Sequence, residues 1–146
     1  MDIIAFLSND GKDFKGRRLS DIWSMPDQEI EATHDFIQIV FPLDEPSQSS
    51  FHGVYLGPED IEAAISNAAV REALIKSSEW FLGFLSRSLS WRSGYNHNQL
   101  RITRVIKCLR MLVGEQQADQ FRGRVLDLLP NKRALSEECL RYWKEA

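Results

Sequence analysis

The sequence predicts an all-α fold, an irregular compact domain of about six to eight helices. Apolar residues recur at steps of three and four in several segments, and no segment shows the strict alternation of a β-strand. The clearest case is 96–113, where the aliphatic residues fall on one helical stripe: Ile102, Val105, Ile106, Leu109, Leu112 and Val113. A stripe of this kind must be covered by other helices.

Length and composition predict one domain over residues 1–146, with 131–146 as a C-terminal extension helix. An apolar content of 43% and a charged content of 27% are typical of a soluble globular protein, and no stretch approaches the roughly 18 apolar residues of a membrane span. Two cysteines without a signal peptide indicate reduced thiols and a cytoplasmic protein. The net charge of −3 argues against a dedicated nucleic-acid binder.

Charge is uneven along the chain. Residues 1–100 carry a balance of −7 and residues 101–146 a balance of +4. Either the two parts dock electrostatically within one fold, or the C-terminal third meets an anionic partner.

The first half is expected to contain several short helices. A helix is predicted over 2–7, followed by a turn at Asn9-Asp10-Gly11. Ser20 is expected to cap a second short helix. A continuous helix follows over 27–40, and Pro42 ends it because the residue before proline avoids the helical region.

The second half is expected to contain longer helices. Residues 43–57 are predicted to form a long loop, and loops of this length are often functional. Gly57-Pro58 begins the next helix, and Asn67 restarts a mostly buried one over 69–89. The remaining start and stop signals are Asn96 or Asn98 as N-cap of the central helix, Gly114 as its left-handed stop, a helix over 115–129, and Ser136 as cap of the last helix.

A polar face on the predicted 27–40 helix is the first candidate site. Its members are spaced i, i+3, i+4, i+7: Glu31, His34, Asp35 and Gln38. Glu-x-x-His is half of a di-iron motif, but neither other histidine has a Glu three residues earlier, so no metal site is expected. His34 is expected to be a buried or half-buried histidine bonded to a neighbour, or to serve local binding with Gln38.

A basic row on the central helix is the second candidate: Arg101, Arg104, Lys107 and Arg110. Three interpretations stay open. The row is a solvated helix face, or it pairs internally with groups such as Glu31 and Asp35, or it binds an anion.

Signs of catalysis are missing from the sequence. Neither cysteine has a sequence-adjacent base, no serine lies in a Gly-x-Ser-x-Gly turn, and the glycines form no phosphate loop. We therefore expect a protein that is not an enzyme and needs no cofactor.

Two runs resemble the opioid growth factor receptor conserved domain. The run 31–43, EATHDFIQIVFPL, is similar to the family signature E-x-x-H-x-[FY]-I-Q-W-L-F-P-L, and the run 97–109, HNQLRITRVIKCL, is similar to its H-N-x-L-R-I-T-R-I-[IL]-x-x-L. The resemblance extends from about Ile3 to Leu129, and the compact form resembles bacterial and fungal members. One departure is Ile39, where the family has tryptophan. That tryptophan lines a ligand groove or belongs to the core.

The resemblance implies a helical domain that binds a peptide or protein and has no catalytic residues to carry over. Vertebrate members of this family act as receptors for Met-enkephalin and associate with the nuclear envelope, which allows peripheral membrane association here. The leading hypothesis places a partner in a groove near Glu31–Gln38 and Arg101–Arg110. The alternatives are a structural or oligomerisation domain whose two polar faces bury against each other, and an enzyme with an unrecognised site.

Overall fold

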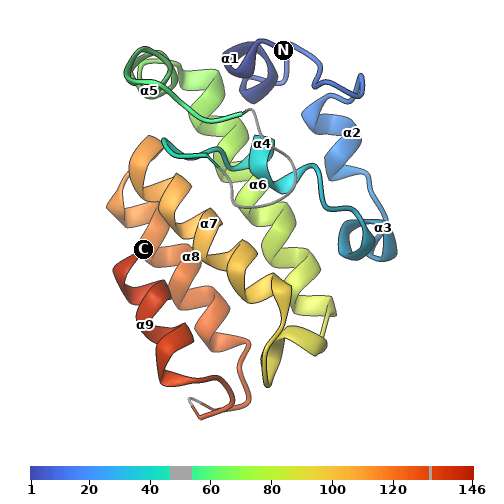
Figure 1. Ribbon diagram of the computed structural model, residues 1–146, viewed down its shortest axis with the longest axis vertical. Helices are drawn as coiled ribbons and strands as arrows, with labels where there is room; N and C mark the ends of the chain where they lie inside the picture. The colour runs from blue at the N-terminus through green and yellow to red at the C-terminus, as the bar shows by residue number, and fades with distance from the viewer. Residues whose placement is uncertain (47–53, 132) are drawn as a thin grey trace. The chain divides into compact units, whose positions relative to one another are not determined.

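The computed structural model describes residues 1–46, 54–131 and 133–146 (Figure 1). Within these ranges it contains nine α-helices and one 3-10 helix and no strand, so the predicted all-α class is confirmed. Residues 47–53 of the predicted loop 43–57 lie outside the described residues, and its described flanks, 43–46 and 54–57, contain no helix or strand. By their contacts the residues form two compact units, Met1–Ser77 and Ser78–Ala146. The prediction of a single domain stays a prediction.

The first unit contains four short helices, one longer helix and the start of a sixth. Their bounds are α1 (Ile3–Leu7), α2 (Leu19–Trp23), α3 (Asp27–Ala32), α4 (Ile37–Val40), α5 (Pro58–Ile65) and α6 (Ala68–Arg87), of which α6 continues into the second unit. Helix α1 packs against α5 (Figure 1). Fully buried apolar side chains form the core of this unit, among them Phe6, Ile22, Ile30, Phe36 and Phe41.

Local capping starts most of these helices as the sequence predicts. The Asp2 carboxylate accepts the main-chain N–H of Ala5 at 3.1 Å, and Asp60 reaches back to the N–H of Gly57 at 2.9 Å. The turn after α1 needs Gly11, because a Cβ there would lie 2.9 Å from the Cβ of Ala5. The predicted role of Ser20 is wrong: α2 already begins at Leu19, and Asp21 accepts the N–H of Arg18 at 2.8 Å.

The predicted continuous helix over 27–40 is also wrong. Helix α3 ends at Ala32, where Thr33 turns to an extended conformation, and α4 begins only at Ile37. Consecutive residues from Phe36 to Leu43 are all buried, whereas a surface helix buries one stripe. Breaking the helix allows both the inward face of α3 and the whole of α4 to be buried. This split accounts for nine helices where at most eight were expected.

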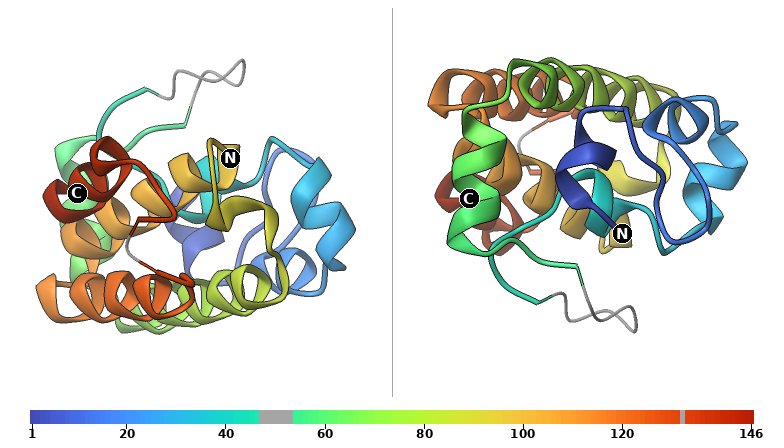
Figure 2. Two further views of the ribbon diagram at one scale, coloured as in Figure 1. Left: turned by 90° about the horizontal axis from the view of Figure 1, so that it is seen from below. Right: turned by 90° about the horizontal axis from the view of Figure 1, so that it is seen from above.

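The second unit is built around α7 (His97–Leu112), which packs against α8 (Glu115–Asp127) and α9 (Glu137–Glu145) (Figure 1, Figure 2). The predicted stripe of α7 faces inward, with Ile102, Val105, Ile106 and Leu109 fully buried. Asn96 caps the helix by accepting the N–H of Asn98 at 2.9 Å, as predicted.

Gly114 separates α7 from α8 as predicted, although not in the left-handed helical conformation. Its φ of 136° and ψ of 167° lie in a region that essentially only glycine adopts. The end of α6 is held differently, by the guanidinium of Arg92, which donates to the carbonyls of Leu85 and Ser86 at 3.2 and 2.8 Å. Helix α6 ends at Arg87, two residues short of the predicted Leu89, and the 3-10 helix that carries Arg92 (Ser90–Arg92) follows after residues 88 and 89.

Trp143 anchors the last helix to the second unit. Its side chain is fully buried, its ring centroid lies 6.5 Å from that of Trp91, and its indole N–H donates to the carbonyl of Gln99 at 3.2 Å. Ser136 caps this helix at the N–H of Cys139, as predicted.

Candidate functional site

The four residues of the predicted polar face do not lie on one helix. Glu31 is in α3, Gln38 is in α4, and His34 and Asp35 are in the connection between them. Gln38 is only 5% exposed and its amide donates to the carbonyl of His34 at 3.2 Å. His34 is exposed, so its expected burial is wrong, while Glu31 and Asp35 are half-buried.

Asp35 is held by two basic residues of the loop before α2. The Arg17 guanidinium donates to its carboxylate at 3.0 Å, and Lys15 forms a second ion pair with the same carboxylate. Partial burial raises the pKa of Asp35, but the hydrogen bonds and positive charges of Lys15 and Arg17 outweigh burial. The pKa therefore lies below its ordinary value of 3.8.

The loop that supplies these cations is closed around Asp13. One carboxylate oxygen, Oδ1, accepts the main-chain N–H groups of Lys15 and Arg17 at 2.8 and 2.9 Å, and Oδ2 accepts the Arg17 Nε at 2.6 Å. Gly16, with a φ of 78°, makes the tight turn. We call Asp13, Lys15, Arg17 and Asp35 the Asp13–Asp35 cluster.

The basic row on α7 is not a uniformly solvated face. Arg101 is 5% exposed and donates to the side chain of Asn98 at 3.3 Å. Arg104 is half-buried, and Lys107 is exposed. Arg110 donates to the main-chain oxygen of Ala146 at 2.6 Å and pairs with Asp119 at 2.8 Å. The row belongs to the second unit and the polar face to the first, so their joint site stays a prediction.

Both cysteines carry free thiols. Burial raises the pKa of the Cys108 thiol far above its ordinary value, although the charge of Arg104 acts in the opposite direction. Burial also raises the pKa of Cys139. Neither thiol is therefore activated as a nucleophile.

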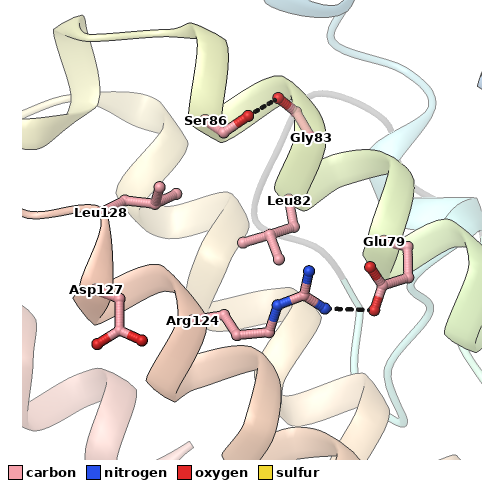
Figure 3. A pocket seen from close by; sticks show the side chains of 7 residues that line it. All are labelled: Glu79, Leu82, Gly83, Ser86, Arg124, Asp127 and Leu128. Carbon is pink, nitrogen blue, oxygen red and sulfur yellow. Dashed lines mark hydrogen bonds and ion pairs between the residues drawn. The ribbon is translucent and has the colours of Figure 1, made fainter.

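A cavity of about 450 Å³ lies between α6 and α8 in the second unit (Figure 3). Its apolar walls are Leu82 and Leu128, and Gly83 contributes no side chain. Glu79 of α6 and Arg124 of α8 pair across it at 2.5 Å. Ser86 and Asp127 complete the lining.

Within residues 1–46, 54–131 and 133–146, no three His, Cys, Asp or Glu side chains come together as a metal-binding group. In the same part of the chain, every helix is too short or too polar to cross a bilayer.

Sequence reasoning identified Asp35 but missed its partners and the α6–α8 cavity. The cluster has a local signal that could have been found: Asp13 and Arg17 are four residues apart around a glycine, in the run DFKGR. The bond from Arg17 to Asp35 spans 18 residues and that from Arg124 to Glu79 spans 45, and neither has a sequence signal.

The departure at Ile39 falls in the core. Its side chain is fully buried, as are those of its neighbours Val40 and Phe41. In this chain the position therefore lines no open groove, and its effect is one of packing volume.

Residues 8–95 match the family model described as "Opioid growth factor receptor (OGFr) conserved region". The match contains the run 31–43 but ends before the run 97–109, so the proposed likeness of the second run stays a prediction. No solved structure matches the chain.

Three curated proteins are similar to this chain, and each is named opioid growth factor receptor. Those of Mus musculus and Rattus norvegicus are 34% identical over 98 residues, which cover 55% of this chain and 15% and 17% of the receptors. That of Homo sapiens is 31% identical over 115 residues, covering 64% of this chain and 16% of the receptor. The chain thus spans less than a fifth of the length of these relatives. Because the family model matches residues 8–95, more than half of the chain, the chain belongs to the opioid growth factor receptor conserved region family.

Proposed function

We propose that this chain is a helical binding domain that takes a peptide or protein partner and catalyses no reaction. Its relatives are named as receptors for an opioid growth factor, which supports a polypeptide ligand. The family match over residues 8–95 contains the whole Asp13–Asp35 cluster, which favours the first unit as the contact surface.

The observation that carries this proposal is that exposed side chains lie on two segments that the hydrogen bonds and ion pairs of the cluster hold in place. Phe14 is 45% exposed between Asp13 and Lys15, and its ring lies 5.7 Å from the Arg17 guanidinium carbon. His34 is exposed directly beside Asp35. The hydrogen bonds of Asp13 hold the loop from Asp13 to Arg17, and the ion pairs of Asp35 hold the connection between α3 and α4.

Such an arrangement suits recognition because the loop is already ordered before a partner binds. Binding loses affinity when loops must be immobilised, and a pre-organised loop avoids that loss. Partly exposed aromatic side chains are the usual anchors of protein interfaces. We infer that Phe14 and His34 contact the partner, whereas Asp13, Arg17 and Asp35 hold them in position.

Panning a phage-displayed random peptide library against the immobilised chain tests the proposal, with an opioid peptide as a separate probe in titration calorimetry. Enriched peptides should lose about tenfold or more in affinity in Phe14→Ala and His34→Ala, a typical loss for an interface anchor. Tyr142→Ala is the matched control, because Tyr142 is 48% exposed and lies outside the family match. Peptides that bind all three variants equally would refute this site.

A second candidate is a purely structural role for the predicted polar residues. It is favoured by the burial of Gln38 and Arg101, each 5% exposed, since a ligand cannot reach such side chains without rearrangement. Arg104→Ala separates the two functions. A lower melting temperature with unchanged peptide affinity supports a structural role for the basic row, and lost affinity at unchanged stability supports a binding role.

A further inference from the structure

Two large apolar side chains are exposed at the start of α7, in the second unit and apart from the proposed surface of the first. Tyr95 is 85% exposed and Leu100 is 59% exposed. Because Asn96 is the N-cap of α7, Tyr95 directly precedes the cap and Leu100 is the fourth residue of the helix. Side chains at these two positions commonly pack against each other at the start of a helix. Here the pair is left largely in solvent.

Hydrogen bonds hold the connection that carries Tyr95. The indole N–H of the buried Trp91 donates to the carbonyl of Leu85 in α6 at 2.9 Å. The side-chain amide of Gln99 in α7 donates to the carbonyls of Trp91 and Gly94 at 3.0 and 3.1 Å. The connection is therefore tied to the end of α6 and to the first turn of α7 (Figure 1).

Basic side chains continue from Leu100 along the same side of α7. Leu100 and Lys107 are the two exposed residues of this helix, and Arg104, which is half-buried, lies between them. Steps of four and three residues place all three on one side of a helix. At a rise of 1.5 Å per residue, the two cations follow Leu100 at about 6 Å and about 10 Å along the helix axis.

The charge of this region is positive. Residues 80–114 contain no Asp or Glu, so every charged side chain from within α6 to the end of α7 is basic. Asp119 of α8 lies beyond Lys107, where it pairs with Arg110 at 2.8 Å. On α9, Glu138 accepts the hydroxyl of Tyr142 at 3.0 Å. An apolar pair followed by cations is the complement of a segment that carries apolar and acidic side chains in the same order.

We propose that Tyr95, Leu100, Arg104 and Lys107 form a second docking surface, which binds an acidic amphipathic segment of a partner polypeptide. Apolar side chains of the partner pack on Tyr95 and Leu100, and its carboxylates pair with Arg104 and Lys107. The arrangement favours a polypeptide over a lipid bilayer. A polypeptide presents apolar and acidic groups one after the other, whereas a bilayer has an apolar layer beneath all of its head groups.

Fluorescence anisotropy with a labelled peptide of two leucines and a tryptophan followed by four glutamates tests this proposal. Binding should saturate and weaken as salt is added. Two matched peptides, one with lysines for the glutamates and one with serines for the apolar residues, should bind at least about tenfold more weakly. Equal binding of either matched peptide would overturn the proposal. So would sedimentation of the chain with phosphatidylserine vesicles when the acidic peptide does not bind.

Substitutions at exposed positions locate the surface. Tyr95→Ser and Leu100→Ser should each weaken binding of the acidic peptide by about fivefold to tenfold, and Lys107→Gln by about threefold. Phe14→Ser is the matched control, because Phe14 is a 45% exposed aromatic residue of the first unit, and it should leave the affinity unchanged. A loss in Phe14→Ser without a loss in Tyr95→Ser would place the peptide on the first unit and refute this surface.

Amide shifts of the unsubstituted chain provide a measurement that does not depend on the folding of any variant. On titration with the acidic peptide, the largest shifts should fall between residues 95 and 107. Shifts centred on residues 13–17 and 34–35 would overturn the second surface and leave the proposed function of the first unit standing.

Discussion

Replacing Asp13 tests whether the loop from Asp13 to Arg17 is held by one buried carboxylate. The side chain of Asp13 is fully buried and its two oxygens have different partners. Oδ1 accepts two main-chain N–H groups, and Oδ2 accepts the Arg17 Nε. Alanine removes all three bonds. Asparagine keeps an oxygen at the Oδ1 position, but its amide NH₂ faces the Arg17 Nε, where two donors oppose each other.

The magnitudes follow from these partners. Hydrogen bonds to charged groups contribute about 1.5–3 kcal/mol each, and removing one partner of a buried ion pair costs about 3–5 kcal/mol. Arg17 keeps its second ion pair, with Asp35, and is partly exposed, which reduces the loss. We expect Asp13→Ala to lower the free energy of unfolding by about 3–4 kcal/mol and Asp13→Asn by about 1–2 kcal/mol.

Urea unfolding followed by far-ultraviolet circular dichroism measures both losses, and hydrogen exchange of the Lys15 and Arg17 amides reports the loop itself. Protection of these amides should be lost in Asp13→Ala and retained in part in Asp13→Asn. Asp10→Ala, at an exposed aspartate three residues earlier, should change stability by less than about 0.5 kcal/mol. Equal losses in the alanine and asparagine variants would refute the division of roles between the two oxygens.

Three further predictions concern other parts of the chain. Trp143→Ala should lower the free energy of unfolding by about 3–5 kcal/mol in urea melts, because a fully buried indole is removed; a loss below about 1 kcal/mol would show that α9 is not anchored there. Gly123→Ala should raise the free energy of unfolding by about 0.5–1 kcal/mol, because the residue lies inside α8 and an added Cβ meets nothing within 4 Å. Calorimetry should show a higher melting temperature for this variant. The lowered pKa of Asp35 means that its stabilisation is complete above its unfolded-state pKa and is lost as the pH falls below 3.8. The stability difference between the wild type and Asp35→Asn should therefore shrink in acid, and a difference independent of pH would contradict the ion pairs.

The sequence by itself determined the fold class and where most helices begin. Asn96 and Ser136 cap α7 and α9 through hydrogen bonds to N–H groups two and three residues further on. Such bonds form within one turn of chain, so the residue type and its place are sufficient to predict them. The inward stripe of α7 follows in the same way from the helical period alone.

The candidate site was predictable only in part. Asp35 was found because it lies in a recognisable run, yet its assignment to a helical polar face was wrong, because α3 ends at Ala32. Helical spacing describes neighbours only while the helix continues. The burial of Gln38 and Arg101 was missed for a related reason: a polar residue gives no sign in sequence of whether other segments cover it.

The tertiary structure alone decided which distant groups meet. Arg17 reaches Asp35 across 18 residues, and Arg124 reaches Glu79 across 45. The first ion pair holds the loop from Asp13 to Arg17 against the connection between α3 and α4, and the second crosses the α6–α8 cavity. Capping forms wherever a few consecutive residues allow it, whereas these contacts exist only after folding has brought distant segments of the chain together.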